Sequence, residues 1–132
     1  MKYLIDTHIF IYIVEGDKSK FSNNQLNILQ NTNNEFYLSS ISLWELAIKF
    51  RIGKIHLKYD FNDYLSVKRR TAKIKILPIK LNYIQKISTL ITAIGHNDPF
   101  DHLIISQSLI ENIPIITNDG KLPLYSNLKI IS

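Results

Sequence analysis

Residues 3–14, with the sequence YLIDTHIFIYIV, contain the pattern that decides the fold. The apolar residues 3–5 predict a short buried strand that ends at Asp6. The apolar run from Ile9 to Val14 then predicts the first turns of a helix that leaves a sheet, and the polar cluster at residues 15–17 ends it. A strand that passes at once into a helix is typical of α/β proteins.

Outward from this stretch, short apolar strands continue to alternate with helices. We expect strands at about residues 36–38, 74–77, 115–117 and 128–131, and helices at about residues 23–30, 42–52, 61–71, 82–94 and 99–111. The helix that Gly53 ends has Trp44 among its apolar positions, and we expect this side chain in the core rather than at the surface as a platform for base stacking. No repeat, linker or change in composition divides the chain. The sequence therefore predicts one α/β domain over residues 1–132, with a short, mostly parallel central sheet covered by helices on both faces.

The composition excludes several classes of protein. With 45% hydrophobic and 20% charged residues among 132, the chain is neither disordered nor fibrous. It has no cysteine, which excludes disulfides, thiolate metal sites and a cysteine nucleophile. Its apolar runs are far shorter than the roughly 20 residues that span a bilayer, and its start lacks the pattern of a secretory signal, so we expect a cytoplasmic protein. The net charge of +5 is compatible with a polyanionic partner such as nucleic acid.

Acidic residues occur where the predicted strands pass into helices. Asp6 ends the first strand, Glu45 lies near the start of the helix after the second, and Asp119 follows the strand at residues 115–117. Asp101 lies in the first turn of the helix at residues 99–111, with Asp98 just before it. Ligands of parallel α/β sheets bind at the carboxyl ends of the strands, so we expect these side chains to share that edge.

Each acid also has a purely structural interpretation. Asp6 and Asp98 are suitable N-caps, and Ser42 with Glu45 has the spacing of a capping box. Asp119 lies in an ordinary Asn-Asp-Gly turn sequence. Independent caps, however, have no reason to converge on one edge. Carboxylates that do converge repel one another unless a cation offsets their charge, and hard oxygen ligands suit Mg²⁺ or Mn²⁺. The set therefore predicts a divalent-metal site.

Four motifs together resemble PIN-domain proteins, especially VapC-type toxins. They are the segments 3–8 (YLIDTH), 42–49 (SLWELAIK), 96–107 (HNDPFDHLIISQ) and 116–119 (ITND). The resemblance extends over essentially the whole chain and implies a three-layer PIN fold and a metal-dependent endoribonuclease. It implies that Asp6, Glu45, Asp101 and Asp119 are the catalytic and metal-binding acids. Two further residues follow from it, since Asp98 is an additional acid of relatives with the sequence DPFD and Thr117 is an active-site hydroxyl that orients a carboxylate or water.

The resemblance also implies partners, and one position departs from it. We expect an RNA substrate, a cognate VapB-type antitoxin and a homodimer. Relatives often have arginine after the second aspartate of DPFD, whereas this chain has His102, so phosphate binding there would depend on pH. Two other interpretations stay open. His8, His96 and His102 could cleave RNA by acid-base catalysis without metal, or the acidic pocket could belong to a non-catalytic module that binds RNA or a basic partner peptide.

Overall fold

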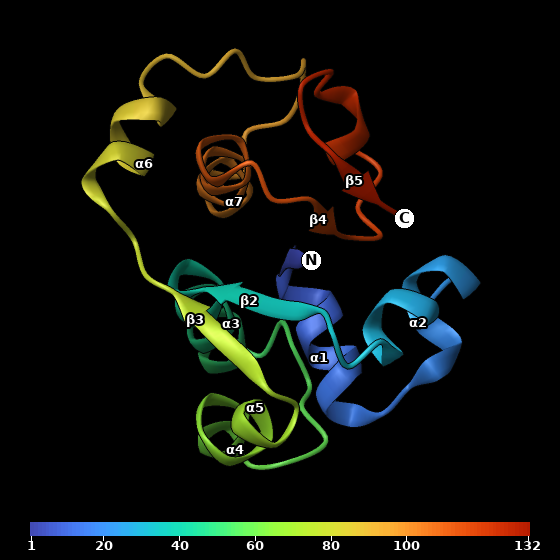
Figure 1. Ribbon diagram of the computed structural model, residues 1–132. Helices are drawn as coiled ribbons and strands as arrows, with labels where there is room; N and C mark the ends of the chain where they lie inside the picture. The colour runs from blue at the N-terminus through green and yellow to red at the C-terminus, as the bar shows by residue number, and fades with distance from the viewer.

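A central sheet of five strands organises the computed structural model, which describes residues 1–132 (Figure 1). The strands are β1 (Lys2–Ile5), β2 (Glu35–Ser39), β3 (Ile74–Leu77), β4 (Ile115–Ile116) and β5 (Ile130–Ile131). Their order across the sheet is β3-β2-β1-β4-β5, and every neighbouring pair is parallel. The expected α/β class is confirmed, with a sheet that is wholly rather than mostly parallel.

Seven α-helices connect and cover the strands. They are α1 (Thr7–Glu15), α2 (Asn23–Gln30), α3 (Ser40–Arg51), α4 (Phe61–Leu65), α5 (Val67–Thr71), α6 (Leu81–Ile87) and α7 (Pro99–Glu111). Short 3₁₀ turns lie at Lys18–Lys20 and Leu122–Leu124. None of the helices has the length and apolar character needed to cross a membrane.

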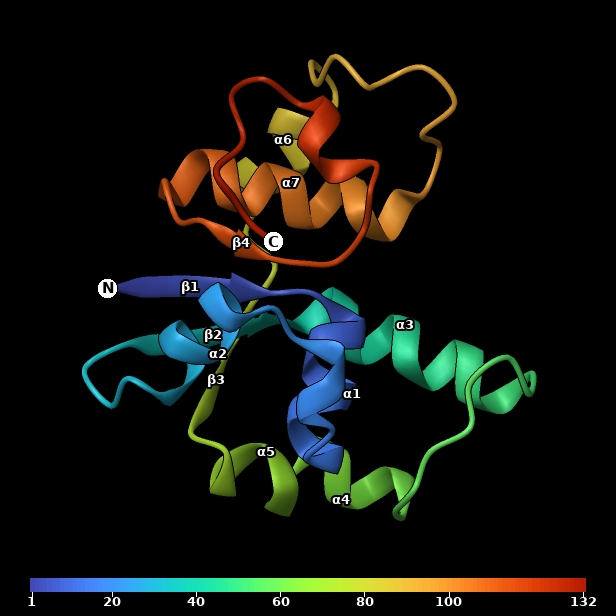
Figure 2. The same cartoon turned by 90° about the vertical axis from the view of Figure 1, so that its right-hand side faces the viewer.

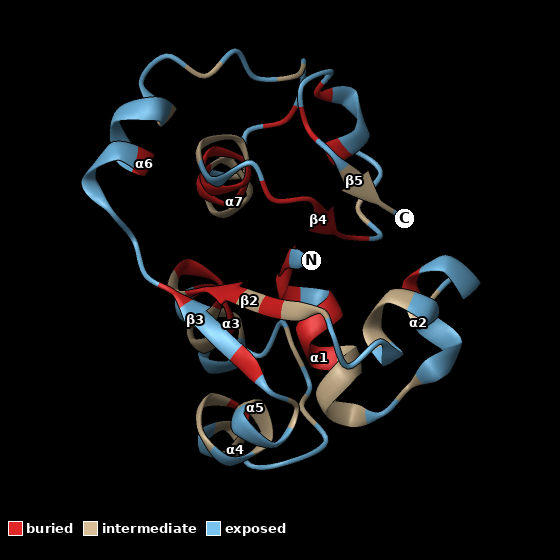
Figure 3. Ribbon diagram, viewed as in Figure 1, coloured by how far each residue is buried: buried red, intermediate tan, exposed pale blue.

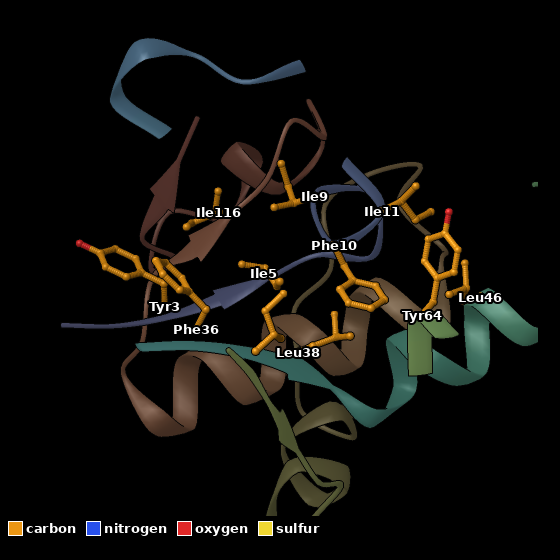
Figure 4. Close-up of a cluster of buried hydrophobic side chains, with 11 residues drawn as sticks. Tyr3, Ile5, Ile9, Phe10, Ile11, Phe36, Leu38, Leu46, Tyr64 and Ile116 are labelled. Carbon is orange, nitrogen blue, oxygen red and sulfur yellow. The ribbon is translucent and has the colours of Figure 1, made fainter. Parts of the chain in front are cut away.

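Alternating side chains of the strands build two cores, one on each face of the sheet. Tyr3 and Ile5 of β1 belong to a cluster with Phe10 of α1 and Tyr64 of α4, which Figure 4 shows in close-up. Leu4, between them in sequence, points to the other face and joins a second cluster with side chains of α6 and α7. Figure 3 shows buried residues in β2, β4 and α7, whereas most of α6 is exposed. The three-layer arrangement follows from this two-sided burial.

Two of the expected helices are shorter than the sequence pattern indicates. The helix expected at residues 61–71 is two helices, because the backbone of Ser66 leaves the helical region and its hydroxyl bonds the Asn62 carbonyl. The helix expected at residues 82–94 ends at Ile87, where the hydroxyls of Ser88 and Thr89 bond the carbonyls at the end of α6. Such local side-chain bonds compete with continued helix.

The start of α3 also differs from the prediction. Ser39, the last residue of β2, is the N-cap, and its hydroxyl accepts the backbone N–H of Ile41 at 3.2 Å. The expected capping box of Ser42 and Glu45 is therefore wrong, and Glu45 lies in the second turn. Trp44 is 61% exposed, so its expected place in the core is wrong too.

Candidate active site

Asp6 is placed by the junction of β1 and α1. Its carboxylate accepts the backbone N–H of Ile9 at 2.8 Å and so caps α1, as expected, while the residue lines a pocket at the carboxyl edge of the sheet. The buried hydroxyl of Thr117, at the end of β4, donates a hydrogen bond to the same carboxylate. Burial raises the pKa of Asp6, and the bonds from Thr117 and Ile9 offset part of that rise. Capping and a place in the pocket are thus compatible.

Glu45 is buried and is held by two neighbours. The Thr7 hydroxyl donates to Oε1 at 2.6 Å, and the Lys49 ammonium lies 2.5 Å from Oε2. Burial lowers the pKa of Lys49, but the bond to Glu45 and the negative charges of Glu45, Asp98 and Asp101 together outweigh this effect and leave the pKa raised. The pair spans four residues of α3, so the helical period aligns it.

The start of α7 supplies two more acids. Asp98 is the N-cap, as expected, and accepts the N–H groups of Phe100 at 2.9 Å and Asp101 at 3.4 Å, with Pro99 in the first turn. The Asp101 carboxylate faces Nε2 of the buried His96 at 3.0 Å. The pKa of Asp101 is raised to about 6, mainly by burial and further by the charges of Asp98, Asp119 and Glu45, against the lowering effect of the bond to His96. The acids therefore repel one another through the pocket.

Asp119 reaches the pocket from the turn after β4. Its N–H donates to the Thr117 hydroxyl at 3.0 Å, and its carboxylate accepts the N–H of Lys121 at 2.8 Å. The turn is anchored from below by the buried Gln25, whose amide donates to the Thr117 carbonyl at 3.3 Å and to the Asn118 side chain at 2.9 Å. Thr117 thus lies beneath the pocket and links the two acids on either side of it.

These segments enclose one pocket of about 290 Å³. It is lined by Asp6, Thr7, His8, Tyr12, Glu45, Lys49, Asp98, Asp101, Asn118 and Asp119. Five of the eleven acidic residues of the chain gather here, and Lys49 is the one lysine or arginine among them. Figure 2 shows that the strand β1 points toward the side of the molecule where α3 leaves the sheet and α7 begins.

The donors of this pocket suit a divalent cation. All five acids offer carboxylate oxygen, the ligand that Mg²⁺ and Mn²⁺ prefer. Their charge exceeds what Lys49 neutralises; burial raises the pKa values of Asp6 and Asp101, and the neighbouring acids add to that rise. In the arrangement described, no three acidic or histidine side chains surround a single point closely enough to hold an ion directly. The carboxylate oxygens of these acids suit such an ion. In this structure Glu45 is hydrogen-bonded to Thr7 and Lys49, and Asp101 to His96.

The histidines do not form a catalytic pair in this pocket. His8 lines it, whereas His96 is buried between Asp101 and the Tyr125 hydroxyl, which lies 2.8 Å from Nδ1. Nε2 of His102 bonds the backbone carbonyl of His96 at 2.8 Å, and its side chain is not among those that line the pocket. His102 therefore fixes the segment that precedes α7.

The sequence did not predict that Thr7, Gln25 and Lys49 belong to the site. Lys49 follows Glu45 by four residues in the helix, a spacing that could have placed it beside that acid. Thr7 adjoins Asp6 but bonds a residue 38 positions away. Gln25 and its partners Thr117 and Asn118 are more than 90 positions apart, and no local pattern connects them.

A wholly parallel α/β sheet with an acidic pocket at its carboxyl edge defines the class of protein. The family model described as PIN domain matches residues 3–127, and the chain belongs to this family. No protein with a curated description matches it.

Solved structures share the fold over nearly the full chain. VapBC2 from Rickettsia felis, bound to a DNA fragment from its promoter, superposes with a TM-score of 0.67 at 24% identity and covers 99% of this chain and 98% of that one. VapBC-1 from nontypeable Haemophilus influenzae gives 0.67 at 21% identity, with 100% and 98% covered. VapBC-5 from Mycobacterium tuberculosis, a member of the VapBC family of toxin-antitoxin systems, gives 0.62 at 14%, with 98% and 97% covered.

Proposed function

We propose that this chain is a metal-dependent endoribonuclease that hydrolyses phosphodiester bonds of RNA and acts as the toxin of a toxin-antitoxin pair. The observation that carries the proposal is the gathering of five acids from four chain segments in one pocket of a chain whose net charge is +5. Membership of the PIN domain family supports nuclease chemistry. The excess of positive charge outside the pocket favours a polyanionic substrate.

Asp6, Glu45, Asp101 and Asp119 would hold Mg²⁺ or Mn²⁺, directly or through water, with Asp98 as an additional acid at the rim. A divalent ion in such a site lowers the pKa of water and offsets the charge that develops on the phosphate. The preference of Mg²⁺ for a few carboxylates, with the remaining positions left to water and phosphate, suits a pocket open to solvent.

The protein's own groups orient the acids. The Thr117 hydroxyl accepts from the Asp119 backbone N–H and donates to the Asp6 carboxylate, so it holds the turn that carries Asp119 next to Asp6. Thr7 and Lys49 hold one oxygen each of Glu45. In the proposed reaction Glu45 accepts the proton of the attacking water and becomes neutral, and the ammonium of Lys49 keeps its carboxylate ionised, and so able to act as the base, before that transfer. Hydrolysis by this route leaves a 5′-phosphate and a 3′-hydroxyl.

The partners follow from the similar structures. Several of these are complexes of VapBC toxin-antitoxin systems, and two contain DNA. We infer a VapB-type antitoxin for this chain, together with a homodimer, a cytoplasmic location and a single PIN domain over residues 1–132. A short reading frame beside this gene that encodes a DNA-binding segment and a basic tail would support the pairing.

One observation favours a second function, a non-catalytic module that binds RNA or a basic peptide. The pocket already holds the ammonium of Lys49 against Glu45, and a lysine or arginine of a partner could bind other acids in the same way. A module of this kind would bind its partner equally well after chelation of divalent ions and would not cleave RNA.

A cleavage assay separates the two functions. Purified protein is incubated with a pool of structured RNAs and Mg²⁺, and the products are resolved by size and end group. We expect cleavage that EDTA abolishes and that Asp101→Asn removes, whereas Asp60→Asn, which keeps an exposed N-cap of α4, cleaves normally. Cleavage that persists in EDTA would contradict the metal mechanism.

A further inference from the structure

Trp44 is the one tryptophan of the chain, and it lies mostly in solvent. Its side chain is 61% exposed, although an indole buried in a core contributes more apolar area than almost any other side chain. The Phe100 ring is its aromatic neighbour, with ring centroids 6.1 Å apart and planes at 89°. This edge-to-face contact fixes the direction of the exposed indole. The core does not account for its position.

The aromatic pair connects the two helices that supply Glu45 and Asp101 to the acidic pocket, although neither ring lines the pocket itself. Trp44 directly precedes Glu45 in α3, and Phe100 directly precedes Asp101 in α7, so each ring is one residue from a carboxylate of the pocket. Figure 2 shows α3 and the first turn of α7 on the same side of the molecule. An RNA strand that leaves the pocket on this side of the molecule would pass the exposed indole.

The surroundings of Trp44 favour nucleic acid over an apolar partner. The helical period brings Arg51, seven residues on and exposed, close to the face of α3 that carries Trp44. Between them on that face lie Ala47 and the half-buried Ile48, so the indole is not the centre of a broad apolar patch. An aromatic ring beside arginine is the combination with which proteins bind single-stranded nucleic acid, by stacking on the base and contact with the phosphate.

We propose that Trp44, oriented by Phe100, stacks on an unpaired base of the RNA next to the bond that is cleaved. The proposal deepens the proposed function and rests on it for the nature of the substrate. Stacking requires a base that is free of its own helix, so the platform selects single-stranded segments and loops over duplex RNA.

The fluorescence of Trp44 reports the contact directly, because no other tryptophan contributes to the signal. The Asp101→Asn variant is titrated in EDTA with a short single-stranded oligoribonucleotide, so that no cleavage occurs, and binding is followed in parallel by the anisotropy of a label on the RNA. We expect quenching that saturates together with the anisotropy. A ribose-phosphate chain of equal length without bases should bind with little quenching.

Kinetics give a second measurement. We expect Trp44→Ala to lower kcat/KM on single-stranded RNA about tenfold, mostly through KM, and Trp44→Phe to restore most of the loss. The matched control is Leu81→Ala, another exposed apolar side chain outside the pocket, which should cleave as the wild type does.

Three results would overturn the proposal. They are unchanged fluorescence at saturating RNA, equal quenching by the chain without bases, and a change in oligomeric state on Trp44→Ala, which would place the indole between copies of the protein. A fourth result, the absence of any RNA binding in the anisotropy measurement, would also overturn it. RNA binding without quenching would contradict the stacking by Trp44 but not the proposed nuclease activity. Quenching by RNA, together with no cleavage by the wild-type protein, would contradict the nuclease activity but not the stacking.

Discussion

Thr117 connects two acids that the sequence separates by 113 positions, Asp6 and Asp119. Its hydroxyl accepts the Asp119 N–H and donates to the Asp6 carboxylate, and the side chain is fully buried. A threonine at a strand end needs neither contact for the stability of the strand. These two bonds support the orienting role proposed for Thr117.

Replacing this hydroxyl tests that role. Thr117→Val keeps the shape of the side chain but removes the donor to Asp6, and we expect RNA cleavage to fall about 10- to 100-fold, as when a hydrogen bond that orients a metal ligand is lost. Thr117→Ser retains the hydroxyl and should keep most of the activity. Single-turnover rates at saturating Mg²⁺ measure the difference, and equal rates for the valine and serine variants would show that the hydroxyl is dispensable.

Burial in the folded protein disfavours the ionised form of the Asp101 carboxyl group. Its pKa of about 6 lies above the ordinary value of 3.8, so between these pH values the folded protein keeps a proton that the unfolded chain has lost. The contribution of Asp101 to the free energy of unfolding therefore decreases as pH rises from about 4 to 6, and it stays low at higher pH.

Asp101→Asn should consequently stabilise the metal-free protein while abolishing cleavage. We expect a gain of about 1 kcal/mol at pH 7, after allowing for solvent screening of a partly exposed carboxylate, and no gain below pH 4. Urea unfolding in EDTA at pH 7 and at low pH measures both. A variant that is less stable than the wild type at pH 7 would contradict the repulsion described for the pocket.

At the scale of elements, α2 is joined to the ends of β4 and β5 by one side chain. The Gln25 amide donates to the Thr117 and Ile131 carbonyls and to Asn118, and its own carbonyl accepts the Ser22 N–H at 3.0 Å. The two strands it binds are each two residues long, so few ladder bonds hold them. Gln25 thus stabilises the turn that carries Asp119.

Removal of this side chain should cost stability and activity together. In Gln25→Ala the buried carbonyls lose their donor, and we expect the free energy of unfolding to fall by about 1 to 3 kcal/mol. Gln30→Ala, an exposed position on the same helix, is the matched control and should change little. Chemical denaturation gives both values, and equal stabilities for the two variants would contradict the anchoring role.

The alternation of elements could be predicted from the sequence, because strands buried on both faces are short apolar runs between helices that begin with clear caps. Asp6 and Asp98 are such caps, and the structure confirms both. The sequence did not locate the start of α3, because Ser39 and Ser42 are both suitable N-caps. In the structure β2 ends at Ser39, and the helix begins directly after it. The prediction that Trp44 lies in the core was wrong for a related reason. Apolar side chains lie on several sides of α3, and only tertiary packing determines which side faces the core.

The acids that share the site could be predicted from the sequence, but the hydrogen-bond partners of these acids could not. The carboxyl edge of a parallel sheet brings strand ends together whatever the residues are, and this rule places Asp6, Glu45, Asp101 and Asp119 in one pocket. The partners of these acids follow from distances between segments far apart in sequence. His96 beside Asp101 and Thr7 beside Glu45 therefore emerge only from the structure.

Over the whole molecule, 16 lysines and arginines outnumber 11 acids, five of which line the pocket, and the cations differ in what holds them. Arg69 donates to the carbonyls of Leu65 and Ile74 at 3.0 and 2.9 Å and so stabilises the turn between α5 and β3. Arg51, at the end of α3, is exposed and free of such bonds to the backbone. Only the second kind of cation is available to RNA phosphates.

Salt dependence should distinguish these two arginines. We expect Arg51→Gln to weaken RNA binding several-fold at low salt and to reduce the slope of log affinity against log salt by about 0.7, the value for one contact with a single strand. Arg69→Gln should lower the melting temperature and leave the slope unchanged. Anisotropy titrations over a range of salt concentrations, made in EDTA, provide the slopes. A slope for Arg51→Gln equal to that of the wild type would remove this residue from the RNA path.

The position of the metal ion is the most direct test of the account as a whole. Crystals soaked in MnCl₂ and measured at the manganese absorption edge would reveal each ion by its anomalous scattering. We expect a peak in the pocket, in contact with at least one of Asp6, Asp101 and Asp119, and no peak there in crystals of Asp101→Asn. A wild-type map that has no peak in the pocket, at manganese concentrations that support cleavage, would contradict the assignment of these acids as the metal site.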